Sequence, residues 1–520
     1  MMRVASLGDM YATIGRLGAE RRDQVALVSS HGRSTSFGAL NDAVSAAATR
    51  LRAEGMCRGD AVAFSVRPSV EAIVLMLATV RAGGVIVAAD PGMGKKLFAA
   101  RMAAVRPRFV MAESLLYALS GSGVARRLLR SRRLELPQIA GLPDCRFVRV
   151  GNWLPGTPSS IDAGRLFRPL EGLSDQPVVL EPEDAVFIVF TSGTTDDPRA
   201  VVHTARSIAA VLSASDDICE LDADSVVLTD QLHSAIPALL AGARVLIPRR
   251  NARPADTVDS LHHSKVTHAF LVPSDLHRLV SYCERRSLAF PNTLRQLVLG
   301  AGPVNRSLLV RLRSLLPAST RVTSVYGLTE MAPVACVDMV EKLAWQGDGD
   351  LVGVPLPGAS VRIDHARELY VSGDRLCGRY LGGERLLEVA TGDLARLDDA
   401  RRVVLLGRSK DMIIRGHYNV YPALYEDKIA EIPGVARCAL VGVWSEEVGD
   451  ERVVLVVEPT AGSGGGEKLR RRVDRALRID ALIDSLALPD EIVVMDLPEL
   501  GRAHKINRGA LRERLGQRPA

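Results

Sequence analysis

The chain has 520 residues, 47% of them hydrophobic, which is enough to bury a large core and predicts more than one domain. Its net charge of +6 is small for this length and spread along the chain, so we expect no nucleic-acid partner. The most apolar stretch, residues 72–80, is too short to span a bilayer, which argues against an integral membrane segment. The seven cysteines show no paired spacing, and no signal-peptide pattern is present. These features predict a cytoplasmic protein without a zinc site or a disulfide framework.

Helices and strands alternate in the first part of the chain. Apolar residues from Leu40 to Leu51 recur at helical spacing, and the predicted helix ends near Gly55. This alternation favours a parallel sheet with helices on both faces. Residues 90–96 lack the Walker spacing before their Gly-Lys pair and are interpreted as a turn and a helix start. The next expected elements are a strand, a helix and a strand, over 61–64, 70–80 and 85–89.

A loop of small hydroxyl residues and glycine follows the apolar run 187–190, which predicts a buried strand. Such a loop can turn several N–H groups and hydroxyls toward one point, which suits the oxygens of a polyphosphate. Arg199 adds a cation nearby. Considered alone, the loop could also be an ordinary Ser/Thr turn. Its residues are Thr191, Ser192, Gly193, Thr194 and Thr195.

The middle of the chain continues the same pattern. A helix is predicted over 201–211 and a strand over 226–228. Next comes a buried strand over 296–299 that opens into a glycine turn, where missing side chains would let the backbone approach a flat ring. The residues of this turn are Gly300, Ala301 and Gly302.

A strand over 321–325 ends in the segment Tyr326-Gly327-Leu328-Thr329-Glu330. The carboxylate of Glu330 suits a hard cation such as Mg²⁺, which binds carboxylate and phosphate oxygens and retains several waters. Taken alone, the segment could also be the start of a helix capped by Thr329. Asp393 follows a glycine after a further strand, and Lys505 lies in a basic segment near the end of the chain.

These motifs, in this order, resemble the AMP-forming adenylating superfamily, which contains acyl-CoA synthetases, luciferases and the adenylation domains of peptide synthetases. The resemblance extends from about residue 20 to 515, and its longest match is residues 407–422. It implies that the hydroxyl loop and Arg199 hold the phosphates, and that Glu330 ligates Mg²⁺. It also implies that Tyr326 stacks on adenine, Thr329 bonds the α-phosphate, Asp393 and Arg408 hold the ribose, and Lys505 bridges the substrate carboxylate and the α-phosphate.

The resemblance implies an α/β fold with two domains. Residues 1–408 would form a large domain of parallel-rich sheets with packed helices that binds ATP and the acyl group. Residues 409–520 would form a small, mobile α/β domain that caps the site. The expected first step is attack of a carboxylate on the α-phosphate of ATP, which gives an acyl-adenylate and pyrophosphate.

Several second steps stay open. Transfer of the acyl group to the thiol of CoA or an acyl carrier protein is the expected fate, with a fatty or other aliphatic acid as substrate. The length of the run 228–242 and the stretch 90–94 also resemble the β-lactone synthetases of bacterial olefin biosynthesis, in which a β-hydroxyacyl adenylate would close on itself. Departures from the family motifs raise a third alternative, a member that binds nucleotide without turnover. They are Asp196, Arg199, Ala200 and His417.

Two polar residues beside the expected acyl pocket have competing interpretations. His233 could be a general base or a wall of the pocket, and a lone histidine is more often structural. Asp230 could contact a substrate amino group, although the rest of an amino-acid pocket code is not recognisable. Neither residue is assigned to the catalytic site.

Overall fold

The computed structural model divides into two compact units. Unit 1 comprises residues 1–270, 329–332 and 374–387, and unit 2 comprises residues 271–328, 333–373 and 388–520. The predicted domain boundary at residue 408 falls inside unit 2 and stays a prediction. The structure describes residues 4–91, 95–123, 136–168, 177–190, 199–249, 252–302, 304, 306–415, 418–445, 450–460, 462, 465–478, 482–483, 487–500 and 505–516.

An eight-stranded sheet forms one half of unit 1. Five neighbouring pairings, from β8 through β4, β3, β5 and β6 to β7, are parallel, and the pairings of β8 with β9 and of β9 with β19 are antiparallel. The predicted parallel sheet is therefore present. The strands are β3 (Ala61–Ser65), β4 (Val85–Ala88), β5 (Phe109–Glu113), β6 (Arg146–Val150), β7 (Ser160–Asp162), β8 (Ala185–Phe190), β9 (Ala200–Thr204) and β19 (Arg379–Tyr380).

The second group of strands in unit 1 runs in the order β12, β10, β11, β1, β2. The pairings of β12 with β10, β10 with β11 and β11 with β1 are parallel, and that of β1 with β2 is antiparallel. Buried apolar side chains from the helices and both groups of strands form one large core. These strands are β1 (Val25–Val28), β2 (Ser34–Ser36), β10 (Val226–Leu228), β11 (Arg244–Leu246) and β12 (His268–Leu271).

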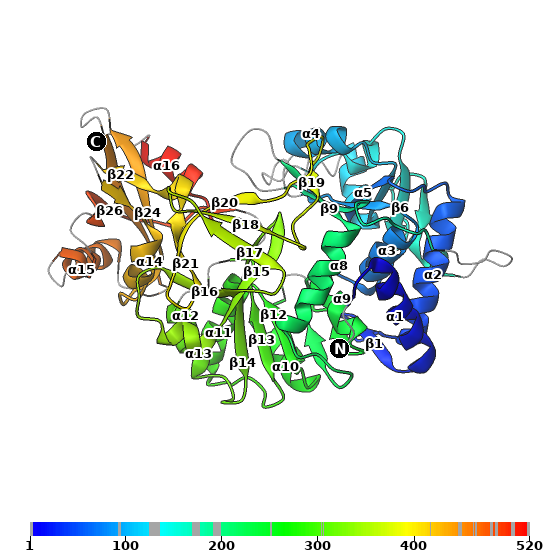
Figure 1. Ribbon diagram of the computed structural model, residues 1–520, viewed down its shortest axis with the longest axis horizontal. Coiled ribbons are helices and arrows are strands. Elements are labelled where there is room, and N and C mark those ends of the chain that lie inside the picture. The colour runs from blue at the N-terminus through cyan, green and yellow to red at the C-terminus, as the bar shows by residue number, and fades with distance from the viewer. Residues whose placement is uncertain are drawn as a thin grey trace. The chain divides into compact units, whose positions relative to one another are not determined.

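The helices of unit 1 follow the sequence pattern closely, with one exception. The predicted helix over 201–211 is wrong in its first third, because residues 200–204 form β9. The β-branched residues there pair antiparallel with β8, and the helix begins only after Thr204, which caps it. The helices, several of which are labelled in Figure 1, are α1 (Leu7–Glu20), α2 (Phe37–Ala53), α3 (Val70–Arg81), α4 (Lys95–Val105), α5 (Ser114–Gly121), α7 (Ala163–Leu166), α8 (Ala205–Ala214), α9 (Leu232–Leu240) and α10 (Pro254–His263).

Unit 2 contains an array of strands in the order β17, β18, β20, β21, β16, β15, β14, β13. Strands β13 and β14 are parallel, and the pairings from β15 to β17 are antiparallel. The bounds are β13 (Gln296–Leu299), β14 (Arg321–Leu328), β15 (Met331–Asp338), β16 (Asp350–Pro355), β17 (Ala359–Ile363), β18 (Glu368–Gly373), β20 (Val389–Leu397) and β21 (Val403–Arg408). The helices beside them are α11 (Pro273–Arg286), α12 (Arg306–Arg313) and α13 (Met339–Ala344).

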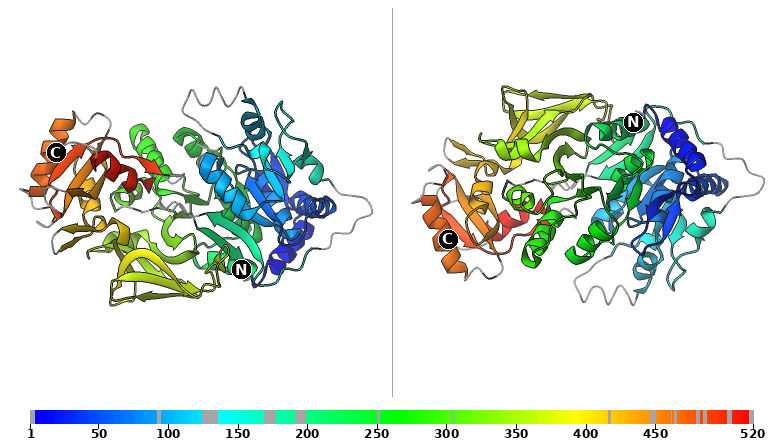
Figure 2. Two further views of the ribbon diagram at one scale, coloured as in Figure 1. Left: turned by 90° about the horizontal axis from the view of Figure 1, so that it is seen from above. Right: turned by 90° about the horizontal axis from the view of Figure 1, so that it is seen from below.

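The C-terminal part of unit 2 has its own three-stranded sheet, β24-β25-β26, and its own apolar cores. These strands and helices, drawn in orange and red, gather in one cluster in both views of Figure 2. The elements are β22 (Ile413–Arg415), β23 (Tyr418–Val420), α14 (Ala423–Ala430), β24 (Val435–Ser445), β25 (Asp450–Pro459), α15 (Gly466–Arg478), β26 (Glu491–Val494), β27 (Glu499–Leu500), β28 (Lys505–Ile506) and α16 (Arg508–Gly516). Across the described ranges, none of the helices combines the length and the apolar character needed to cross a bilayer.

A buried charge cluster in unit 2 gives a first testable consequence. Lys342 of α13 is 7% exposed and pairs with the Asp350 carboxylate. Burial and the Asp350 charge, followed by Glu426 and Glu431, raise the pKa of Asp427 to about 7, and Lys342 opposes them. Because the unfolded chain loses this proton near pH 4, the folded state loses stability as the pH rises from about 4 to about 7.

Asp427→Asn is therefore expected to stabilise the protein at pH 8 by about 1 kcal/mol or more, since one pKa unit corresponds to about 1.4 kcal/mol. The gain should vanish near pH 4, where the wild-type carboxyl is protonated in both states. Thermal unfolding at the two pH values measures it. Asp348→Asn is the control, because Asp348 is 79% exposed and should change neither value. Equal gains at both pH values would contradict the assignment.

Candidate functional site

Unit 2 holds a buried carboxylate that is bound from both sides. Asp393 is 4% exposed, and its Oδ2 accepts a hydrogen bond of 2.6 Å from the Tyr326 hydroxyl. Its Oδ1 lies 2.6 Å from Nε of Arg408, whose side chain is about half exposed. The sequence analysis predicted all three as nucleotide-binding residues, and the structure brings them together.

The local fold explains why these residues meet. Asp393 on β20 is the register partner of Arg408 on β21, so antiparallel pairing alone places them side by side. Gly392 has a φ of 71°, which favours glycine, and the Thr391 hydroxyl accepts a hydrogen bond from the Asp393 amide. Residues 391–393 thus form an irregularity inside a longer strand.

Two cations, Arg408 and Lys505, act on the carboxylate of Asp393. Burial raises the pKa of Asp393, while Arg408, the Tyr326 hydroxyl and the Lys505 ammonium oppose that rise. Burial and the adjacent Asp393 charge raise the pKa of Tyr326 well above its usual range, so Tyr326 remains a donor. Lys505 therefore acts electrostatically on the carboxylate that was predicted to hold the ribose.

Arg508 fixes the segment that carries Lys505. Its guanidinium donates 2.7 Å to the Leu440 carbonyl and 2.6 Å to Oε2 of Glu426, and it lies 3.5 Å from Oδ2 of Asp411. Its side chain is 16% exposed. Strand β28 ends two residues before Arg508, so the hydrogen bonds and ion pairs of this largely buried guanidinium fix the chain next to the strand. Lys505 itself is exposed on that strand.

The predicted glycine turn lies at the end of β13. Leu299 of β13 pairs with Ser324 of β14, so residues 300–302 lie at the same edge of the sheet as the end of β14 with Tyr326. Ala301 has a φ of 66°, which is strained for a residue with a side chain. Such strain is a common feature of ligand-binding turns.

Thr329 and Glu330 form a turn in unit 1. The alternative of a helix start at Thr329 is wrong, because strand β15 follows directly. The Tyr380 hydroxyl donates 3.0 Å to Oε1 of Glu330, and the Cys377 amide donates 2.8 Å to its carbonyl. Nε2 of His203 lies 2.9 Å from the Thr329 carbonyl.

His203 and Tyr380 contact this turn, and sequence reasoning missed both of them. His203 is 8% exposed, and burial lowers its pKa, so the neutral ring donates through Nε2. Its buried Nδ1 has no hydrogen-bond partner within the described part of the chain. A histidine directly before a helix cap gave no signal of this contact, and Tyr380 lies 50 positions from its partner Glu330.

The residues fit a magnesium ion that arrives with a nucleotide. Mg²⁺ is usually held by one or two carboxylates together with substrate phosphates. Glu330 supplies one carboxylate, and no group of three potential ligands occurs among the residues that the structure describes. The ion would then take most of its ligands from phosphate oxygens and water. The predicted phosphate loop, residues 191–195, lies outside the described residues, as do Asp196 and His417, while the neighbouring Arg199 stacks 5.2 Å from the centre of the Tyr380 ring.

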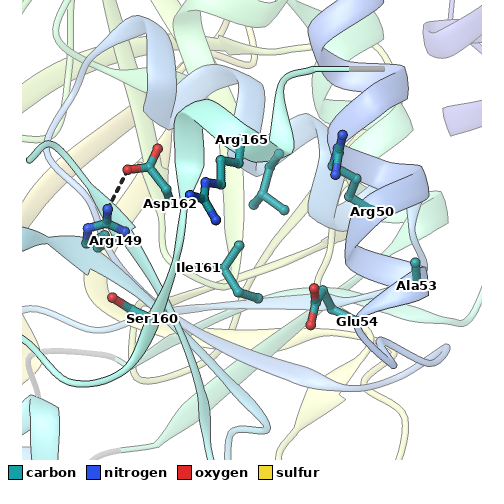
Figure 3. A pocket seen from close by; sticks show the side chains of 9 residues that line it. Arg50, Ala53, Glu54, Arg149, Ser160, Ile161, Asp162 and Arg165 are labelled. Carbon is teal, nitrogen blue, oxygen red and sulfur yellow. Dashed lines mark ion pairs between the residues drawn. The ribbon is translucent and has the colours of Figure 1, made fainter. Parts of the chain in front are cut away.

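The remaining candidate residues and the cavity in unit 1 add nothing to the predicted site. Asp230 accepts a hydrogen bond of 2.9 Å from the Gln231 amide, and the His233 side chain is outside the description. A cavity of about 490 Å³ in unit 1 is lined by arginines from α2, β6 and α7 (Figure 3). One of them, Arg149, pairs with Asp162 at 2.6 Å. None of the predicted site residues lines this cavity.

Comparison with known proteins identifies the family. The model of the family described as "AMP-binding enzyme" matches residues 16–381. An indoleacetate–CoA ligase of Aromatoleum aromaticum is 29% identical over 355 residues, 62% of this chain and 66% of that protein. An olefin β-lactone synthetase of Xanthomonas campestris pv. campestris is 27% identical over 522 residues, 88% of each chain. In several relatives the match covers less than two thirds of the relative's own length.

Solved structures agree on the fold. The amide bond synthetase McbA from Marinactinospora thermotolerans superimposes with a TM-score of 0.78 at 22% sequence identity, covering 97% of this chain and 99% of that one. The predicted α/β fold class is therefore confirmed. The family match covers well over half of the chain and confirms the resemblance noted from its motifs, including the prediction that the protein is an enzyme. The chain belongs to the family of AMP-binding enzymes.

Proposed function

We propose that the protein activates a carboxylic acid with ATP to an acyl-adenylate, with release of pyrophosphate, and then transfers the acyl group to a thiol of CoA or of an acyl carrier protein. The observation that carries this proposal is the buried Asp393 carboxylate with Arg408 and Tyr326 bound to it. A carboxylate can accept both hydroxyls of a ribose, and its neighbours hold it in one orientation. The relatives named as CoA ligases support the second step.

Each residue has a defined task in this reaction. The Tyr326 ring would stack on adenine, and the Arg408 guanidinium would bind the ribose together with Asp393. The Thr329 hydroxyl would bond the α-phosphate, and Glu330 would hold Mg²⁺. When bound, the ion neutralises phosphate charge. Residues 191–195 and Arg199 would hold the β- and γ-phosphates.

Lys505 would act on the charge that develops during adenylation. As the carboxylate attacks the α-phosphorus, negative charge shifts toward the departing pyrophosphate and the bridging oxygens. A lysine ammonium is a compact charge on a flexible stem, and it can stabilise that charge without a covalent step. The lowering effect of Lys505 on the pKa of Asp393 supports its presence near the bound nucleotide.

A second candidate is closure of a β-hydroxyacyl adenylate to a β-lactone. The match to an olefin β-lactone synthetase over 88% of both chains favours it. In that reaction the substrate hydroxyl oxygen would attack its own activated carbonyl carbon, the C–O bond to AMP would break, and AMP would leave while a base or a phosphate oxygen takes the hydroxyl proton. No external thiol is needed, and proximity favours the ring because both groups belong to one molecule.

The test measures pyrophosphate release with ATP, Mg²⁺ and a panel of fatty, aryl-substituted and 3-hydroxy acids. Mass spectrometry then identifies the acyl products with and without CoA or a loaded carrier protein. A thioester supports the first proposal, and a lactone with AMP but without CoA supports the second. ATP binding without pyrophosphate release for every acid would contradict both and favour a nucleotide-binding member without turnover.

A further inference from the structure

The Glu330 carboxylate is fixed by a second residue that the reaction scheme does not include. The Tyr380 hydroxyl donates a hydrogen bond of 3.0 Å to Oε1 of Glu330. The same stretch of chain also holds the Glu330 backbone, because the Cys377 amide donates 2.8 Å to its carbonyl. Both the side chain and the backbone of Glu330 are therefore positioned by residues 377–380.

Tyr380 is itself fixed to the strand that follows the predicted phosphate loop. It lies on β19, which pairs antiparallel with β9, and its register partner is Val201. The next residue, Leu381, donates 2.8 Å from its amide to the Ala200 carbonyl. The position of Glu330 is thus coupled through Tyr380 to the residues directly after the loop.

Arg199 acts on the same ring. Its guanidinium lies 5.2 Å from the centre of the Tyr380 ring, a distance at which a cation is attracted to an aromatic face. Burial, together with the Glu330 charge, raises the pKa of Tyr380 to about 12, and Arg199 opposes the rise. The Tyr380 side chain is therefore contacted by Glu330 at its hydroxyl and by Arg199 at its ring.

We propose that Tyr380 is a positioning residue for the magnesium-bound nucleotide, which holds the Glu330 carboxylate in its metal-binding orientation and is held in turn by Arg199. This inference rests on the proposed function. A hydrogen bond to one carboxylate oxygen fixes the rotation of the carboxylate before the ion binds. It also gives a role to Arg199, because a planar guanidinium stacks well on an aromatic face.

Tyr380→Phe tests the hydroxyl while keeping the ring that Arg199 contacts. Removal of a residue that orients a metal ligand costs roughly 10- to 100-fold in metal affinity. Calorimetric titration with ATP at several Mg²⁺ concentrations gives the Mg²⁺ concentration at which half of the increase in ATP affinity is reached. We expect this concentration to rise about 10-fold in Tyr380→Phe. ATP binding in EDTA should not change. Tyr370→Phe is the matched control, since Arg362 stacks 4.0 Å from the centre of the Tyr370 ring at a partly exposed site.

A double variant separates positioning from a general structural effect. If Tyr380 acts through Glu330, adding Tyr380→Phe to Glu330→Gln should cause no further loss of the Mg²⁺ effect. Should Tyr380→Phe fail to fold, Glu330→Asp provides the same test, because it keeps the charge and withdraws it from the tyrosine by one methylene. It should raise the Mg²⁺ requirement to a similar extent.

Two results would overturn the inference. The first is an unchanged Mg²⁺ requirement in Tyr380→Phe, or in Glu330→Asp where that variant replaces it. The second is a fully additive loss of the Mg²⁺ effect in the double variant. Either result leaves a wild-type enzyme whose ATP binding responds to Mg²⁺, so the proposed function would stand. A wild-type protein whose ATP affinity does not respond to Mg²⁺ would contradict the metal role of Glu330, and both proposals would fall together.

Discussion

Lys505→Ala is expected to lower the rate of adenylate formation by a factor of about 100 or more and to leave ATP affinity nearly unchanged. Loss of one group that stabilises developing charge typically costs about 100- to 1000-fold in rate. In the proposed function, the ground-state nucleotide would keep its contacts to Asp393, Arg408 and Tyr326, so binding should depend little on the lysine. The measurements are acid-dependent exchange of pyrophosphate into ATP and calorimetric titration with ATP.

Lys468→Ala serves as the control for this experiment, because Lys468 is an exposed lysine on α15. It should change neither the exchange rate nor the affinity. Parallel losses of rate and of ATP affinity in Lys505→Ala would mean that the lysine binds the nucleotide in its ground state. A rate close to the wild-type rate would remove Lys505 from the reaction.

Asp393→Asn is expected to weaken ATP binding by about 10- to 100-fold. The amide offers one acceptor oxygen in place of two, and its NH₂ group would face either the Arg408 guanidinium or the Tyr326 hydroxyl, both of which are donors here. A buried donor without an acceptor costs about 1–3 kcal/mol, which corresponds to this range of affinity. Calorimetric titration gives the change directly.

The pH dependence of ATP binding follows from the same group. Burial raises the pKa of Asp393 above 3.8, so its carboxylate is lost at a higher pH than that of an exposed aspartate. ATP affinity of the wild type should consequently fall as the pH decreases through that raised pKa, and the asparagine variant should lack this step. Asp474→Asn, on the exposed face of α15, is the control. An unchanged affinity in Asp393→Asn would contradict the ribose-binding role.

The sequence was a good guide wherever a motif is short and local. Asp393 and Arg408 lie on adjacent strands, and the residues between them form the connection that sets their register. Tyr326 lies in the last three residues of β14, a strand that the sequence pattern already indicates. For such residues, position along the chain and position in the fold are closely linked, so the predicted grouping of the three residues appears in the structure.

The same reasoning failed where a long-range pairing decides the outcome. The segment 201–204 has a pattern that a helix could also satisfy, and only its pairing with β8 makes it a strand. Tyr380 reaches Glu330 because β19 joins the edge of β9, which no local pattern encodes. His203 was overlooked for the same reason, since its partner is the Thr329 carbonyl, 126 positions away.

Unit 1 is built from three separate segments of the chain, which matters when the protein is divided into fragments. The unit combines residues 1–270 with two short inserts, 329–332 and 374–387, that come from much later in the chain. A truncated chain ending at residue 270 would lack β19, and β9 would become an open edge with unpaired N–H and C=O groups, a surface that invites aggregation. A self-contained fragment would instead have to carry both inserts on artificial connections. A fragment that ends at residue 270 is accordingly an incomplete unit 1 and is not expected to fold as that unit does in the full chain.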